Sequence, residues 1–104
     1  MNPALALARK LGVTVAFADL GDWGLDELRS EYYPDEPDGP AIRLNIRVAE
    51  HLPPEELGEF VVLAVGHELY HHRERIGEIP TLRDRKSREL AANEFARSLL
   101  HKRE

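Results

Sequence analysis

The sequence contains no cysteine among its 104 residues. This absence excludes disulfide bonds, thiolate metal sites and cysteine nucleophiles. A bound metal ion would therefore have to be held by His, Asp, Glu or Asn side chains. Such a nitrogen–oxygen donor set favours zinc, or another divalent ion such as Mn²⁺.

Long hydrophobic runs are also missing. No segment approaches the roughly 18–20 consecutive apolar residues that a membrane-spanning helix requires. The apolar stretch from Pro3 to Ala8 is too short for the core of a signal peptide, and Arg9 and Lys10 follow it rather than precede it. We therefore expect a cytoplasmic protein without a membrane partner.

An excess of positive charge is the third feature that the chain lacks. The formal net charge is −5, which does not indicate direct binding of nucleic acid. The charge is uneven, because residues 19–38 are acidic apart from Arg29, whereas residues 83–103 are net basic. Such runs usually form solvated surface. The alternative is that the acidic half attracts a basic partner protein.

The length and composition indicate one soluble globular domain over residues 1–104, with 42% hydrophobic and 32% charged residues. Periodicity, caps and turn residues predict three helices and three strands. The helices are expected over residues 3–11, 53–75 and 87–102, and the strands over residues 13–17, 31–33 and 41–48. A short helix from a cap at Asp22 to Leu28 and a cap at Thr81 are further expectations. The order predicts an α+β fold, with a small sheet of about three strands packed on a long helix and a C-terminal helix.

The segment from Ala41 to Val48 alternates apolar and polar residues, which predicts a half-buried strand. Peptidases often bind a substrate as an added strand along a sheet edge. If this strand is such an edge, Arg43 and Asn45 would line the substrate groove.

The long helix is apolar on all sides from Phe60 to Val65, which predicts a central, buried position. It continues into the motif His67-Glu68-Leu69-Tyr70-His71. Two histidines four residues apart lie on one face of a helix, so both imidazoles can bind one metal ion at about 2.0–2.1 Å. This is the H-E-x-x-H pattern of zinc peptidases.

Glu68 is expected to point toward the same cleft without reaching the metal. From there its carboxylate can take a proton from the water that attacks the substrate and pass it to the leaving amine. The alternative is a structural cluster of polar residues. Buried polar groups need partners, however, and a metal ion is one such partner.

A zinc site of this kind needs a third protein ligand. We predict Glu89, because the loop before the last helix is long enough for that helix to fold back on the long helix. Glu94 lies about 140° further around the helix, so both acids cannot face the metal. The residues that continue the side of Glu89 are apolar: Ala92, Ala96 and Leu99. Asn93 shares the face of Glu89 and would orient a metal ligand, the alternative being a surface amide.

The other histidines and aromatic residues give weaker expectations. We expect His72 at the surface, His51 in a loop and His101 at a solvated end, where it could also approach the cleft. Packing is the default for Tyr32, Tyr33 and Tyr70, with contact to the cleft as the alternative. Leu90, Phe95 and Leu99 are expected on the inner side of the last helix.

Two segments resemble a known family. Residues 67–72 (HELYHH) and 89–100 (ELAANEFARSLL) resemble the ImmA/IrrE metallopeptidases, whose signature is H-E-L-x-H followed by E-x-x-A-N-x-F-A-x-x-L-L. The strand Ile42-Arg43-Leu44-Asn45 is similar to the I-x-x-N strand of that family. The resemblance covers about residues 11–100, and its second half is the more specific part.

The resemblance implies a minimal zincin-like domain with a gluzincin-like site. His67, His71 and Glu89 would be the ligands of a zinc ion, and Glu68 would be the general base. The usual role in the family is cleavage of a helix-turn-helix transcriptional repressor, which implies a protein or peptide substrate. Tyr70 stands where the family usually has a small residue, often Gly, and would narrow the cleft.

The expected function is therefore that of a zinc-dependent endopeptidase. An alternative is a non-cleaving, metal-containing module that grips a regulatory protein. Glu68 favours the peptidase, because binding alone does not need this acid. The end of the pattern at Leu100, where family members often continue as L-L-M-P, favours the binding module. A third interpretation is a structural helical domain.

Overall fold

The computed structural model describes residues 2–21 and 29–101. The elements in chain order are α1 (Pro3–Leu11), β1 (Thr14–Ala18), β2 (Ser30–Tyr33), β3 (Ala41–Asn45), α2 (Ile46–Ala49), α3 (Pro54–Arg75) and α4 (Arg85–Leu100). The predicted α+β class is confirmed. The predicted short helix from Asp22 to Leu28 lies outside the described residues.

The three strands form one mixed sheet with the order β1-β3-β2. β1 runs parallel to β3, and β2 runs antiparallel to it. On β3, Ile42 and Leu44 are buried, whereas Arg43 between them belongs to the opposite face of the sheet. The alternation of the sequence thus directs one face of the sheet toward the helices.

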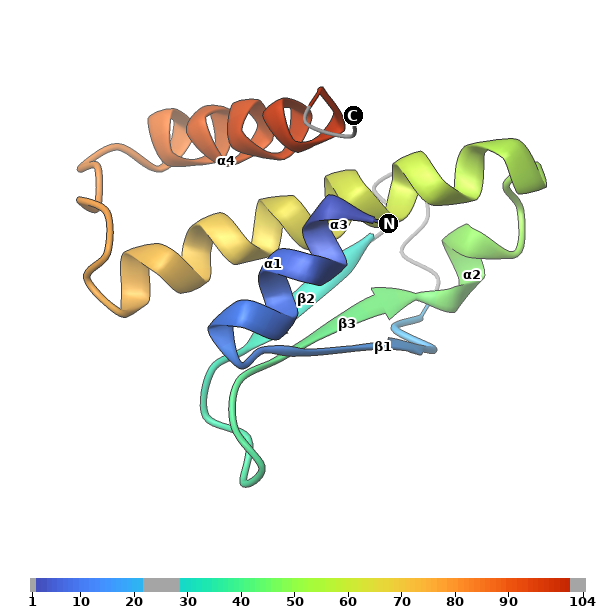
Figure 1. The fold of residues 1–104 in the computed structure, drawn as a ribbon, viewed down its shortest axis with the longest axis horizontal. Helices are drawn as coiled ribbons and strands as arrows, with labels where there is room; N and C mark the ends of the chain where they lie inside the picture. Colours follow the sequence, from blue (N-terminus) through green and yellow to red (C-terminus); the bar gives the residue numbers. More distant parts are fainter. Residues whose placement is uncertain (1, 22–28, 102–104) are drawn as a thin grey trace.

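The elements are stacked in layers. α1 and α3 cover one face of the sheet, and α4 lies on the side of α3 that faces away from the sheet (Figure 1). The predicted burial of α3 is confirmed at Phe60, Val62, Ala64 and Val65. Within the described ranges, none of the helices has both the length and the apolar character needed to cross a bilayer.

The predicted strand over residues 41–48 was too long. It ends at Asn45, whose side chain accepts a hydrogen bond from the backbone N–H of Arg47 at 3.2 Å and so caps α2. The helical turn still buries Val48, while Ile46 becomes 39% exposed. Alternation over three more residues was therefore compatible with a turn of helix as well as with a strand.

The prediction that this strand forms a substrate-binding edge was also wrong. β3 is the central strand, and both of its sides are paired with neighbouring strands. Arg43 lies on the outer face, where it pairs with Glu36 and stacks 4.2 Å from the ring centroid of Tyr33. Asn45 is 1% exposed and structural.

The last helix begins and packs differently from the prediction. Its N-cap is Asp84, which accepts a hydrogen bond from the N–H of Ser87 at 3.0 Å, and not Thr81. Leu90 is 52% exposed, so it does not belong to the inner side. The buried residues of α4 are Ala92, Ala96 and Leu99.

α3 and α4 approach each other closely where both have small residues. A Cβ atom added at Gly66 would lie 2.9 Å from the Cα atom of Ala96. This contact fixes the spacing of the two helices beside the His67–His71 segment.

Candidate metal centre

The two helices that carry the predicted site run antiparallel (Figure 1). On α3, Leu63, His67 and His71 follow at intervals of four residues, and on α4 so do Glu89, Asn93 and Arg97. Residues at this spacing share one helix face. Because the helices are antiparallel, His71 lies opposite Glu89, and His67 lies opposite Asn93.

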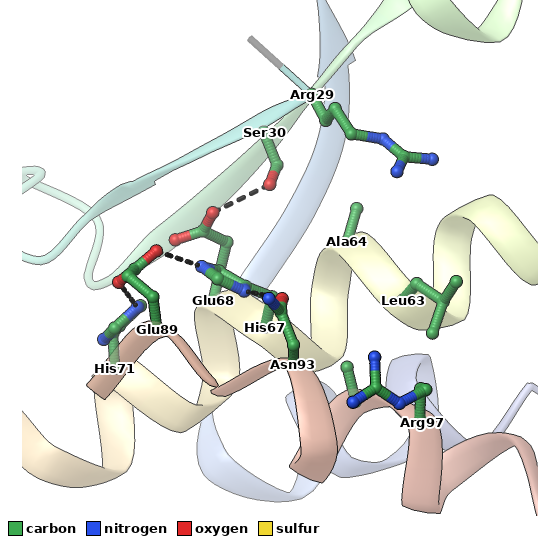
Figure 2. A pocket seen from close by; sticks show the side chains of 11 residues that line it. Arg29, Ser30, Leu63, Ala64, His67, Glu68, His71, Glu89, Asn93 and Arg97 are labelled. Atoms are coloured by element: carbon green, nitrogen blue, oxygen red, sulfur yellow. Dashed lines mark hydrogen bonds and ion pairs between the residues drawn. The ribbon is translucent and has the colours of Figure 1, made fainter. Parts of the chain in front are cut away.

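The three predicted ligands are brought together. The Nε2 atom of His67 lies 3.2 Å from one carboxylate oxygen of Glu89, and the Nε2 atom of His71 lies 3.0 Å from the other. The ligand atoms of the three residues all lie within 4.8 Å of one another, so the group could hold a metal ion. The predicted meeting of Glu89 with both histidines is therefore present (Figure 2).

The outer nitrogens of the two imidazoles are also fixed. The Nδ1 atom of His67 lies 2.8 Å from Oδ1 of Asn93, and Nδ1 of His71 lies 2.9 Å from Oε1 of Glu74. Both oxygens are acceptors, so each Nδ1 carries the proton and donates it. This leaves Nε2 of both histidines as the nitrogen that presents a lone pair to Glu89.

This arrangement gathers acceptors around one point. Unprotonated Nε2 atoms and a carboxylate repel one another at 3.0–3.2 Å unless a positive charge lies between them. That charge is either a proton on an imidazole or a metal ion. Two imidazole nitrogens and one carboxylate are a donor set that zinc accepts, and hydrogen-bonded Nδ1 atoms are typical of histidines that bind metals.

Glu74 was not predicted from the sequence as part of the site. Its side chain is 3% exposed, and both of its oxygens accept hydrogen bonds from the guanidinium group of Arg88, at 2.9 and 3.1 Å. The hydrogen bonds from Arg88, together with the one from His71, lower the pKa of Glu74 against the opposing effect of burial. Its position three residues after His71, on the same helix face, was an available signal. Nothing in the sequence indicated the partner Arg88.

Glu68 points into the pocket beside the three ligands without belonging to their group, as predicted (Figure 2). Its Oε2 atom accepts a hydrogen bond from the hydroxyl group of Ser30 at 2.7 Å. Ser30 is a buried residue at the first position of β2. This contact could not be predicted from the sequence, because it depends on how the sheet packs against α3.

The site opens into a pocket of about 630 Å³. Besides His67, Glu68, His71, Glu89 and Asn93, it is lined by Arg29, Ser30, Leu63, Ala64, Ala96 and Arg97. The pocket therefore has an acidic end with the predicted ligands and a second end where Arg29 and Arg97 lie on either side of Leu63 and Ala64 (Figure 2).

Tyr70 packs against neighbouring rings, which was the default expectation, and its alternative place at the cleft is not observed. Tyr70 does not line the pocket, because its ring points toward α4, 6.2 Å from the centroid of Phe95. It also meets the ring of His71 edge-on at 5.9 Å, which supports this histidine from the side. Tyr32 and Tyr33 do not line the pocket either, which agrees with packing as their default role.

His72 was predicted at the surface and is instead buried, with 5% of its area exposed. Its Nδ1 atom forms a hydrogen bond with the hydroxyl group of Tyr32 on β2. The prediction failed because the sheet covers this side of α3 while α4 covers another. Burial is the main cause of the lowered pKa of His72. His51 and His101 are exposed, as predicted.

Comparisons of the chain with protein-family models, with curated proteins and with solved structures find no match.

Proposed function

We propose that this protein is a zinc-dependent endopeptidase related to the ImmA/IrrE metallopeptidases. The observation that carries the proposal is the meeting of His67, His71 and Glu89 at one end of an open pocket, with Glu68 beside them. A cluster of polar residues with a purely structural role would require neither a pocket of peptide size nor the adjacent acid Glu68.

A divalent ion bound by the three ligands would supply a Lewis acid that polarises the peptide carbonyl and activates water. The proton transfers are carried out by a side chain of the protein. Glu68 accepts the proton of the attacking water and later passes it to the leaving amine. The hydrogen bond from Ser30 holds one oxygen of Glu68, which leaves the other oxygen available for the proton.

The substrate is proposed to be a protein segment in extended form. Among the described strands, β2 pairs on one side only, and its first residue Ser30 lines the pocket. An added strand along β2 would thus pass close to the ligands, whereas β3 cannot accept one. A helix-turn-helix repressor is the substrate class that the family resemblance favours, and such a substrate would place the protein in the cytoplasm.

The replacement Glu68→Gln tests this proposal. Zinc-loaded wild-type protein is incubated with a peptide mixture from a bacterial proteome, and new termini are identified by mass spectrometry. The variant should lose about 10²–10⁴-fold of the cleavage rate, because general-base catalysis contributes about this factor. It should keep one zinc ion per chain, since Glu68 is not a ligand.

Glu94→Gln is the matched control, because Glu94 is an exposed acid of α4 that does not line the pocket. It should cleave like wild type. Equal cleavage by the Glu68→Gln variant would reject the proposed mechanism. Stoichiometric zinc without any cleavage by wild type would replace the peptidase with the non-cleaving binding module.

A further inference from the structure

The end of the pocket that faces away from the proposed ligands carries two guanidinium groups. Arg29 reaches it from the start of β2, and Arg97 reaches it from α4 (Figure 2). We propose that Arg29 and Arg97 form a subsite for a carboxylate of the bound peptide, an inference that relies on the proposed peptidase function for its substrate class.

Both guanidinium groups are available for an anion. Within residues 2–21 and 29–101, neither side chain forms an ion pair or a hydrogen bond. Arg43 and Arg88, by contrast, form ion pairs with Glu36 and Glu74. Two guanidinium groups at one end of the pocket, neither of them neutralised by an acid, favour an anion there over a cation.

Arg29 is held in place without using its hydrogen-bond donors. Its guanidinium carbon lies 5.2 Å from the ring centroid of Phe60, which is itself 2% exposed. This cation–π contact occupies the face of the guanidinium group and leaves its N–H edges open. Those edges match the two oxygens of a carboxylate.

The floor between the arginines is apolar, formed by Leu63, Ala64 and Ala96. It offers no side-chain acceptor to the guanidinium groups, and it limits the water around an anion bound there. An ion pair at the rim of such a surface is stronger than one in open water. Glu68 and Glu89 belong to the other end, so an acidic peptide side chain is favoured only at the arginine end.

The spacing along α4 gives the position of the carboxylate in the peptide. Arg97 lies eight residues after Glu89, which corresponds to about 12 Å along the helix axis. An extended peptide advances about 3.3–3.6 Å per residue. The acidic residue should therefore lie two or three residues from the bond that is cut. The long side chains of Arg and Glu span the remaining distance.

The test uses binding, so it does not depend on cleavage. Pools of octapeptides are prepared with Glu or Gln at one position and a mixture elsewhere, each with an amidated or a free C-terminus. They are passed over immobilised, zinc-loaded Glu68→Gln protein at 50 mM salt, and the retained peptides are sequenced. We expect Glu to be retained about 1.5- to five-fold more strongly than Gln, the range for an exposed ion pair.

Three further variants test whether the two arginines cause the preference for Glu. Arg29→Gln and Arg97→Gln in the same protein should each reduce the preference for Glu, and Arg97→Lys should keep part of it. Arg85→Gln is the matched control, because Arg85 is an exposed arginine of α4 outside the pocket, and it should keep the full preference. Salt at 500 mM should weaken the preference in the parent protein.

The outcomes are distinct. A preference for free over amidated C-termini, without a preference for internal Glu, would assign the subsite to the terminal carboxylate. Equal retention of Glu and Gln peptides, or no retention of either, would overturn the subsite. Retention with a Glu preference but no cleavage by the wild-type protein would leave the subsite intact and contradict the peptidase.

Discussion

The four residues closest to the proposed chemistry were predictable because all of them lie on helices, whose period fixes which residues share a face. His67, Glu68 and His71 are fixed relative to one another by the helical period alone. Glu89 needed one further assumption, an antiparallel return of α4, and the structure shows it. Ser30 could not be predicted, because its contact with Glu68 joins residues 38 positions apart in different layers.

Glu74 provides a prediction at the scale of one residue. The replacement Glu74→Gln removes the negative charge of the group that accepts the hydrogen bond from His71 Nδ1–H, so it weakens the hold on the ring. Loss of such a partner typically weakens metal affinity about ten- to a hundred-fold. Competition with a chromophoric chelator measures the zinc affinity, and circular dichroism at the same temperature checks that the variant is folded.

Glu78→Gln is the control for this measurement. Glu78 pairs with Arg73 at 2.8 Å, and its side chain is 44% exposed, without contact to His71. Its replacement should leave the zinc affinity unchanged. If both variants bound zinc as tightly as wild type, Glu74 would have no positioning role.

At the scale of elements, side-chain hydrogen bonds determine where a helix or strand begins or ends when the sequence pattern fits more than one boundary. The amide of Asn45 ends β3, caps α2 and also accepts a hydrogen bond from the N–H of Leu20 at 3.2 Å. Alternation alone could not reveal this, because the competing contacts come from a segment 25 residues earlier. The structure likewise places Asp84, and not the predicted Thr81, at the start of α4, because its carboxylate accepts a hydrogen bond from the N–H of Ser87.

The two glycines of α3 give a matched pair of variants. In Gly66→Ala the new Cβ would lie 2.9 Å from a backbone atom of Ala96 and 3.0 Å from a side-chain atom of Leu99, so the helices must move apart. Such overpacking costs about 1–3 kcal/mol. In Gly58→Ala the Cβ meets nothing within 4 Å, and the gain in helix propensity should stabilise the protein by about 0.5–1 kcal/mol.

Urea unfolding of both variants measures these changes. Because Gly66 lies one residue before His67, the displaced α4 should also bring Glu89 out of position and weaken zinc binding. A Gly66→Ala variant as stable as Gly58→Ala would show that the helices are not packed as closely as the structure indicates.

At the scale of the whole molecule, charge is distributed differently inside and outside the pocket. The chain has a net charge of −5, which suits a basic protein partner, yet two arginines lie at one end of the pocket. In the proposed peptidase, the overall charge would affect the encounter with a partner protein, and the pocket arginines would contact residues beside the bond that is cut. Composition could predict the first and could not predict the second, because Arg29 and Arg97 lie far apart in the sequence.

The layered arrangement leaves α4 as an outer layer that packs mainly on α3. A metal ion held by His67, His71 and Glu89 would join these two helices directly and stabilise the folded state. Zinc at about a hundred times its dissociation constant adds about 2.7 kcal/mol, which raises the Tm by about 10 °C or more for a domain of this size. EDTA should reverse the shift, and zinc should slow amide hydrogen exchange in α4.

Glu89→Gln should largely lose this stabilisation by zinc, and Glu94→Gln should keep it. A wild-type Tm that does not respond to zinc, or an equal response from the Glu89→Gln variant, would contradict a metal centre between the two helices.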